Sequence, residues 1–169
     1  VTEVRAAIPE GTPLFVRISA TDWLPDRDSW TVEDSARLAE DLQPPGVDLV
    51  DVSAGGIAPD QQVPDSGPHY QVPYAERIGE SGTAVGTVGK ITTPQGADEV
   101  VRHGRAELAI VGREHLRDPY FATRAARELG YDAPVPRQHT RGFPCRSVSS
   151  GLDHRSPCRR RSPAPVRPR

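Results

Sequence analysis

The chain has 169 residues, enough for one domain of ordinary size, and its 21 basic and 23 acidic residues leave a net charge of −2. This balance argues against a nucleic-acid-binding or membrane-surface protein, and no run of 18 apolar residues is present to cross a bilayer. Two cysteines exclude a disulfide scaffold, and we expect a cytoplasmic protein because no signal peptide is visible at the first residues.

The first half of the chain predicts two strands with a helix between them. Residues 13–19 are rich in β-branched and aromatic side chains, which predicts a strand. The residues Thr31 to Asp34 have the spacing of a capping box, and apolar residues at helical spacing follow until Pro44. Residues 47–52 predict a second strand, and the long loop from Ser53 to about Tyr70 is of a length usually found in functional segments.

The second half repeats this alternation. A short helix is predicted from Pro73, where proline suits the first turn, and it carries Ile78 on its apolar side. The remaining predictions are a strand over 83–88, a helix from Thr93 to Gly104, a strand over 108–111, and a helix from Asp118 through Leu129. Four strand–helix units indicate a parallel sheet, either a small open sheet or half of a (βα)8 barrel. The absence of a GxGxxG motif after the first strand weakens the open-sheet alternative.

Ligands of parallel α/β folds bind at the carboxyl ends of the strands, so the residues there are candidate site residues. The last two strands end at Gly89 and at Gly112-Arg113, where free backbone amides beside an arginine would suit a phosphate. These glycines are equally compatible with tight turns alone. Arg17 lies within an apolar strand, where it either faces an anionic ligand or pairs with Asp48 or Asp51 on the next strand.

The last 26 residues differ from the rest of the chain. Residues 144–169 carry seven arginines, five prolines and only one acidic residue, whereas residues 1–143 carry 22 acidic and 14 basic residues. We therefore expect a domain over 1–143 and a disordered basic tail over 144–169. The alternatives for the tail are translation past a shifted frame or a lost stop codon, and a basic segment that attracts acidic partners without specificity. Cys145 and Cys158 have no zinc-site spacing, so we expect no metal site.

Several motifs resemble the second half of Old Yellow Enzyme-type flavin oxidoreductases, and most closely the bacterial ene-reductases among them. The motifs follow one another in register over roughly residues 10–143. They are Leu14–Ser19, Gly46–Gly56, Tyr70–Ala75, Val88–Thr92, Gly112–Pro119 and the ending Arg141-Gly142-Phe143.

The resemblance implies an α/β fold that is the C-terminal half, strands five to eight, of a (βα)8 TIM barrel. It also implies an FMN-binding, NAD(P)H-dependent enzyme that reduces activated alkenes such as enones and forms homo-oligomers, with no specific nucleic acid or membrane partner. Arg17 would lie against the flavin pyrimidine edge, and Gly89, Gly112 and Arg113 would hold the FMN phosphate. Arg141 would reach into the active site of a partner subunit, and the loop from Ser53 to Tyr70 would lie over the barrel mouth.

The chain also departs from this family. It begins just before the fifth strand–helix unit, and the part without a counterpart here carries the family's substrate-orienting histidine pair and proton-donating tyrosine. We therefore expect no catalytic residues in this chain, and none of its histidines forms a matching pair: His69, His103, His115, His139 and His154. The alternative function is a non-catalytic flavin- or phosphate-binding remnant of such an enzyme.

Overall fold

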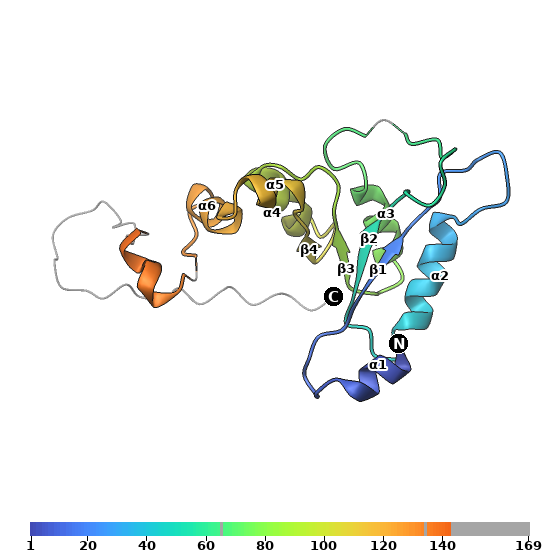
Figure 1. Cartoon of the computed structure of the whole chain (residues 1–169), viewed down its shortest axis with the longest axis horizontal. Coiled ribbons are helices and arrows are strands. Elements are labelled where there is room, and N and C mark those ends of the chain that lie inside the picture. The colour runs from blue at the N-terminus through green and yellow to red at the C-terminus, as the bar shows by residue number, and fades with distance from the viewer. Residues whose placement is uncertain (65, 134, 143–169) are drawn as a thin grey trace.

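The computed structural model describes residues 1–64, 66–133 and 135–142 (Figure 1). The predicted basic tail over 144–169, with Cys145 and Cys158, and the aromatic residue of the Arg141-Gly142-Phe143 ending lie outside the described residues.

Four parallel strands form one sheet in the order in which they occur along the chain. They are β1 (Phe15–Ser19), β2 (Leu49–Ser53), β3 (Val85–Thr87) and β4 (Leu108–Ala109). The predicted α/β alternation with a parallel sheet is confirmed. The last two strands are shorter than predicted, although the pairing continues beyond β4, where the Ile110 N–H donates to the Thr87 carbonyl at 2.7 Å.

The four predicted helices are present as α2 (Val32–Leu42), α3 (Val72–Gly79), α4 (Pro94–Arg102) and α6 (Phe121–Glu128). The predicted capping box begins α2: the Thr31 side chain accepts the Asp34 N–H, and the Asp34 carboxylate accepts the Thr31 N–H. The last helix was predicted to begin at Asp118, and this start is wrong. The Asp118 carboxylate instead accepts the Tyr120 N–H in a turn and binds Arg124, so the helix begins at Phe121.

Three short elements were not predicted: α1 (Thr2–Ala7), α5 (Arg113–Arg117) and the 3-10 helix η1 (Arg137–Gly142). Neither α1 nor α5 contains a buried residue, so neither carries the apolar stripe that identifies a helix in sequence. Side-chain hydrogen bonds hold α1 in place, because Arg5 donates to the Gly46 carbonyl and to the Asp48 carboxylate.

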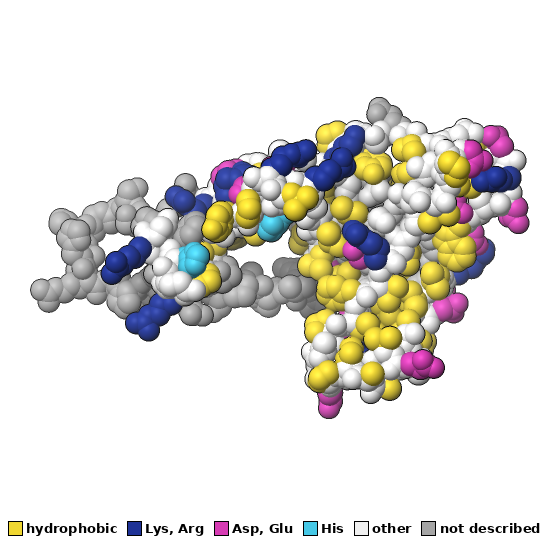
Figure 2. Space-filling view, viewed as in Figure 1, with side chains coloured by type: hydrophobic (Ala, Val, Ile, Leu, Met, Phe, Trp, Pro, Cys, Tyr) yellow, Lys and Arg dark blue, Asp and Glu magenta, His cyan; other side chains and the backbone are white. Residues whose placement is uncertain are grey.

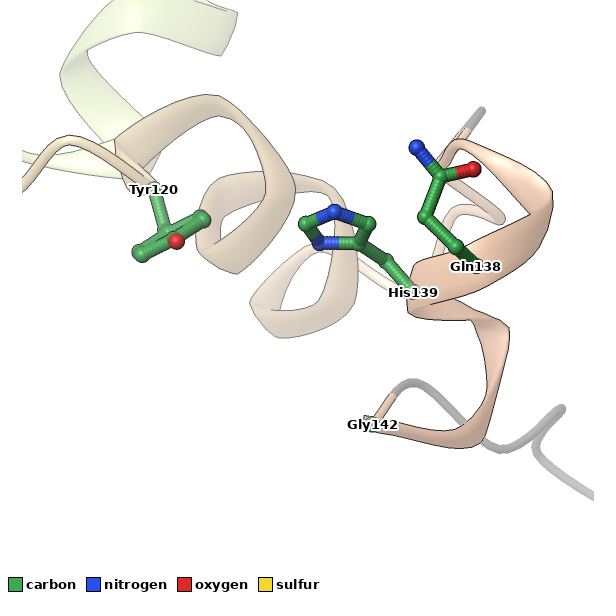
Figure 3. Close-up of a pocket in the computed structure, with 4 residues that line it drawn as sticks. All are labelled: Tyr120, Gln138, His139 and Gly142. Atoms are coloured by element: carbon green, nitrogen blue, oxygen red, sulfur yellow. The ribbon is translucent and has the colours of Figure 1, made fainter.

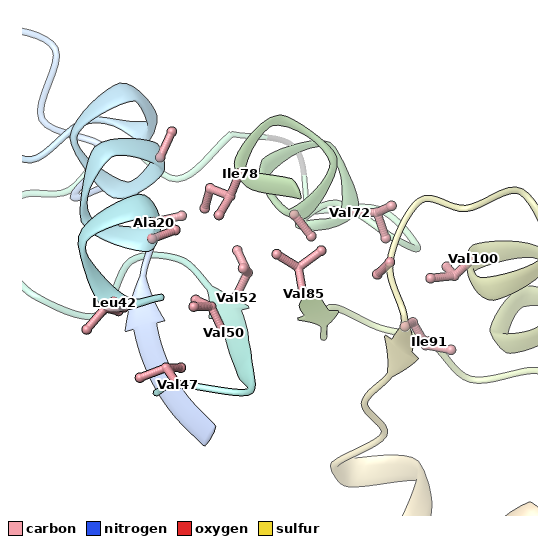
Figure 4. Close-up of a cluster of buried hydrophobic side chains, with 14 residues drawn as sticks. Ala20, Leu42, Val47, Val50, Val52, Val72, Ile78, Val85, Ile91 and Val100 are labelled. Atoms are coloured by element: carbon pink, nitrogen blue, oxygen red, sulfur yellow. The ribbon is translucent and has the colours of Figure 1, made fainter. Parts of the chain in front are cut away.

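The hydrophobic core lies between the sheet and the helices α2, α3 and α4 (Figure 4). Alternate residues of β1, β2 and β3 face these helices, as the two-residue period of a strand requires. On the helix side, Leu42, Val72, Ile78 and Val100 close the layer. The core side chains are mostly valine and alanine, which fit the narrow space between a parallel sheet and its crossover helices.

The opposite face of the sheet has no helix over it among the described residues. Figure 2 shows hydrophobic side chains over the strands, and Phe15 and Leu108 from this face are 52% and 41% exposed. In the described part of the chain, β1 and β4 each pair along one edge only. A four-stranded parallel sheet covered on one face is compatible with part of a (βα)8 barrel, whose other strands would complete the interior. None of the helices described is long and apolar enough to span a membrane.

Candidate functional site

A cleft of about 700 Å³ opens at the carboxyl ends of the strands. The strand β1 contributes Arg17, and the segments that follow β3 and β4 contribute Gly89, Gly112 and Arg113. All four residues predicted to bind a cofactor therefore lie around one cavity, although the first and the last are 96 positions apart in the sequence. The sheet brings them together because the carboxyl ends of parallel strands meet at one edge.

The cleft is rich in positive charge, although the chain as a whole is slightly acidic. Four of its lining side chains are basic and only Glu114 is acidic; the basic residues are Arg17, Lys90, Arg113 and Arg117. Figure 2 shows basic side chains along the upper edge of the molecule in the region of α5. The Arg117 guanidinium donates to Glu114 at 3.1 Å, which offsets one of these charges. The remaining excess favours an anionic ligand.

Apart from Gln71, Thr92 and the two glycines, the rest of the lining is apolar or aromatic. Val88 and Ile91 follow β3, Ile110 and Val111 follow β4, and Tyr70 closes the cleft from the end of the long loop. A cavity with apolar walls and a few convergent charges is the usual form of a site for a small molecule or cofactor. Together the lining suits a ligand that has both a flat apolar part and an anionic group.

The two glycines of the cleft have different structural roles. Gly89 has a φ of 130°, and a Cβ there would lie 3.1 Å from the Gln71 Cβ, so the turn itself requires glycine. A Cβ on Gly112 would meet nothing within 4 Å, so neither close packing nor a positive φ explains this glycine. Gly112 precedes α5, whose first amides have no acceptor within the helix and can face a ligand. A tight turn therefore explains why residue 89 is glycine, but it does not explain why residue 112 is.

Arg17 and Asp51 pair across neighbouring strands. They are partners in the β1–β2 register, with Arg17 Nε 2.9 Å from Asp51 Oδ2 and Nη2 3.4 Å from Oδ1. The two interpretations of Arg17 are thus compatible, because the residue pairs with Asp51 and also lines the cleft. Asp48, the other candidate partner, instead binds Arg5.

Lys90 is a cleft residue that the sequence reasoning did not select. It adopts a φ of 53°, which is uncommon for a residue with a side chain. Its ammonium group donates to the carbonyl and, at 3.0 Å, to the hydroxyl of Ser66, and it lies 5.9 Å from the centre of the Tyr70 ring. These contacts attach the loop between β2 and α3 to the cleft. Lys90 directly follows Gly89 and is the one lysine of the chain, and these two facts could have identified it from the sequence.

Arg141 does not line this cleft. It lies exposed on η1, which Figure 1 shows extending away from the sheet. A separate, shallow hollow of about 320 Å³ lies beside η1, where the His139 ring points toward Tyr120 (Figure 3). The described part of the chain brings no group of three or more His, Cys, Asp or Glu side chains together in a way that could hold a metal ion.

Comparison with known proteins relates the chain to flavin enzymes. A sequence model of the NADH:flavin oxidoreductase / NADH oxidase family matches residues 1–132. An NADPH dehydrogenase of Geobacillus thermodenitrificans is 48% identical over 132 residues, which are 78% of this chain and 38% of that protein. An NADPH dehydrogenase of Geobacillus sp. strain WCH70 is 45% identical over 132 residues with the same coverage. The chain thus spans well under half the length of these curated relatives.

Proposed function

We propose that this chain, which belongs to the NADH:flavin oxidoreductase / NADH oxidase family, is the FMN-binding part of an NAD(P)H-dependent oxidoreductase. The observation that supports the proposal best is the cleft, where basic side chains and glycine-flanked amides adjoin an apolar wall. This combination fits FMN, which has one phosphate and one flat ring system. When bound, FMN would accept hydride from a reduced nicotinamide and deliver it to an acceptor.

The residues of the cleft divide between the two ends of such a ligand. Arg113 and the amides that follow Gly112 would hold the phosphate, and Gly89 would let the backbone after β3 approach it. Arg17 would lie at the ring, where a cation stabilises the negative charge of a reduced flavin. Val88, Ile110 and Tyr70 would exclude water from the ring.

The shape of the sheet supports a larger intact fold. The proposal includes four further strands, supplied from outside these residues, which would close a (βα)8 barrel over Phe15 and Leu108. In that assembly we expect reduction of an activated alkene, with the residues that orient and protonate the alkene on the other half. Arg141, which lies away from this cleft, would serve the site of a neighbouring subunit.

Titration of the purified 169-residue chain with FMN, followed by quenching of flavin fluorescence, tests the proposal. We expect saturable binding that weakens at least tenfold in Arg113→Gln, whereas the matched variant Arg37→Gln, an exposed arginine on α2, binds like the wild type. Absence of saturable binding by the wild-type chain would overturn the proposal. Addition of NADPH to the loaded chain then separates the two functional alternatives, because a binding remnant would leave the flavin oxidised.

A further inference from the structure

We infer that Asp51 is the counter-charge of Arg17 and thereby sets the reduction potential of a flavin held in the cleft. This inference rests on the proposed function, because it assumes that Arg17 faces the flavin ring. Asp51 itself does not line the cleft, so it acts through Arg17 as a positioning residue.

Asp51 binds one side of the Arg17 guanidinium. Both Asp51 oxygens face Arg17, one toward Nε at 2.9 Å and the other toward Nη2 at 3.4 Å. Such a side-on pair fixes the plane of the guanidinium as well as its position. The Arg17 Nη1 atom is left out of the pair and remains available to the cleft. Among the described residues, Arg17 forms its hydrogen bonds and ion pair with Asp51 alone.

The residues around the Arg17–Asp51 pair leave each of the two charges to act mainly on the other. The Arg17 side chain is 55% exposed and that of Asp51 is 17% exposed, so the carboxylate is the inner member. The next residue in the same register is Gly86 on β3, which has no side chain to compete for the carboxylate. Glu114, the acidic residue of the cleft lining, is bound to Arg117. Asp51 therefore directs its charge to Arg17.

The sign of the effect follows from the charges. An unpaired arginine beside a flavin would favour the reduced, negatively charged form and raise the potential. A carboxylate against the same arginine cancels much of that field, because opposite charges about 3 Å apart act at a greater distance mainly as a dipole. Asp51 thus keeps the potential lower than Arg17 alone would set it.

The test is the reduction potential of FMN bound to the full 169-residue chain, measured by equilibration with a reference dye. We expect Asp51→Asn to raise the affinity for reduced flavin relative to that for oxidised flavin about tenfold. For a two-electron couple this raises the reduction potential by about 30 mV. Arg17→Gln should shift this ratio of affinities by a similar factor in the opposite direction, and the double variant should return to within about twofold of the wild type. If the two residues had only a structural role, the two single variants would not shift the reduction potential in opposite directions.

A control variant and the double variant make the outcome of this test interpretable. Glu76→Gln breaks another carboxylate–arginine pair, with Arg105, outside the cleft, and should leave the potential unchanged. If Asp51→Asn fails to bind FMN, the double variant carries the test, because it leaves neither charge without its partner. A double variant with the potential of Arg17→Gln, or an Asp51→Asn variant with the potential of the wild type, overturns the inference alone. A wild-type chain that binds no FMN overturns the proposed function and this inference with it.

Discussion

The indole Nε1–H of Trp23 donates to the hydroxyl of Tyr74 at 2.9 Å, which joins the segment after β1 to helix α3 across 51 positions of sequence. The Trp23 ring also covers Gly55, where a Cβ would lie 2.3 Å from a ring carbon, so this close approach requires glycine. Through these two contacts Trp23 fixes the segment that follows β1 against helix α3 and against the segment that follows β2.

Tyr74→Phe should therefore lower the free energy of unfolding by about 1 kcal/mol, because the half-buried indole N–H loses its acceptor. Urea unfolding followed by tryptophan fluorescence measures the change. Tyr120→Phe is the matched control, because Tyr120 is 60% exposed, and it should unfold at the wild-type urea concentration. Equal midpoints for Tyr74→Phe and the wild type would contradict the role of this hydrogen bond.

Two adjacent valines of α4 provide a test of the core. Val100 is fully buried and Val101 is 46% exposed, so the same substitution has different consequences at the two positions. Val100→Ala should cost about 2–3 kcal/mol through lost burial and the cavity that remains, whereas Val101→Ala should cost less than about 0.5 kcal/mol. Thermal and urea unfolding would measure both, and a similar loss at both positions would contradict the packing of α4 described above.

The capping box of α2 predicts a pH dependence. The hydrogen bond from Thr31 lowers the pKa of Asp34 below its ordinary value of 3.8. The folded state therefore binds this proton less readily than the unfolded state, and the stabilisation is present above pH 3.8 and lost as the pH falls through the lowered value. Asp34→Asn should be less stable than the wild type at neutral pH, and the difference should shrink in acid. Urea unfolding of both chains at neutral and at acid pH measures this difference, and a difference that stays the same at both would contradict the role of the capping box.

Two glycines should separate stability from binding. A Cβ on Gly86 would lie 2.7 Å from the Ile110 Cδ1 and 3.2 Å from the Leu49 Cδ2, so the ends of these side chains must shift and Gly86→Ala should cost about 1 kcal/mol of stability. Gly112→Ala meets nothing within 4 Å and should unfold within about 0.5 kcal/mol of the wild type. Because its methyl group would lie beside the proposed phosphate position, its affinity for FMN should fall about tenfold. A stable Gly112→Ala chain with unchanged FMN affinity would argue against this placement of the phosphate.

The alternation of strands and helices was predictable because each main element carries its own local signal. The capping residues of α2, the proline at the start of α3 and the β-branched runs of β1 and β2 are all readable in sequence. The short helices α1 and α5 were missed because their side chains are held by ion pairs and solvent rather than by an apolar stripe. The end of β4 was placed too late because its strand-like residues continue into the wall of the cleft.

The candidate site was predictable in part. Strand ends identify Arg17, Gly89, Gly112 and Arg113, since the topology of a parallel sheet places all strand ends together. The choice of Asp51 over Asp48 as the partner of Arg17 depends on the register of β1 against β2, which the sequence alone left open. The contribution of Lys90 depends on an unusual backbone conformation and on the path of a long loop, neither of which has a local sequence signal.

The position of Lys90 also has a practical consequence. It is the single lysine among 169 residues, and it stands at the rim of the cleft. Apart from the amino terminus, an amine-reactive dye would find one attachment point, directly beside the proposed ligand. A fluorophore coupled there would report ligand entry as a change in emission, without a cysteine introduced for the purpose.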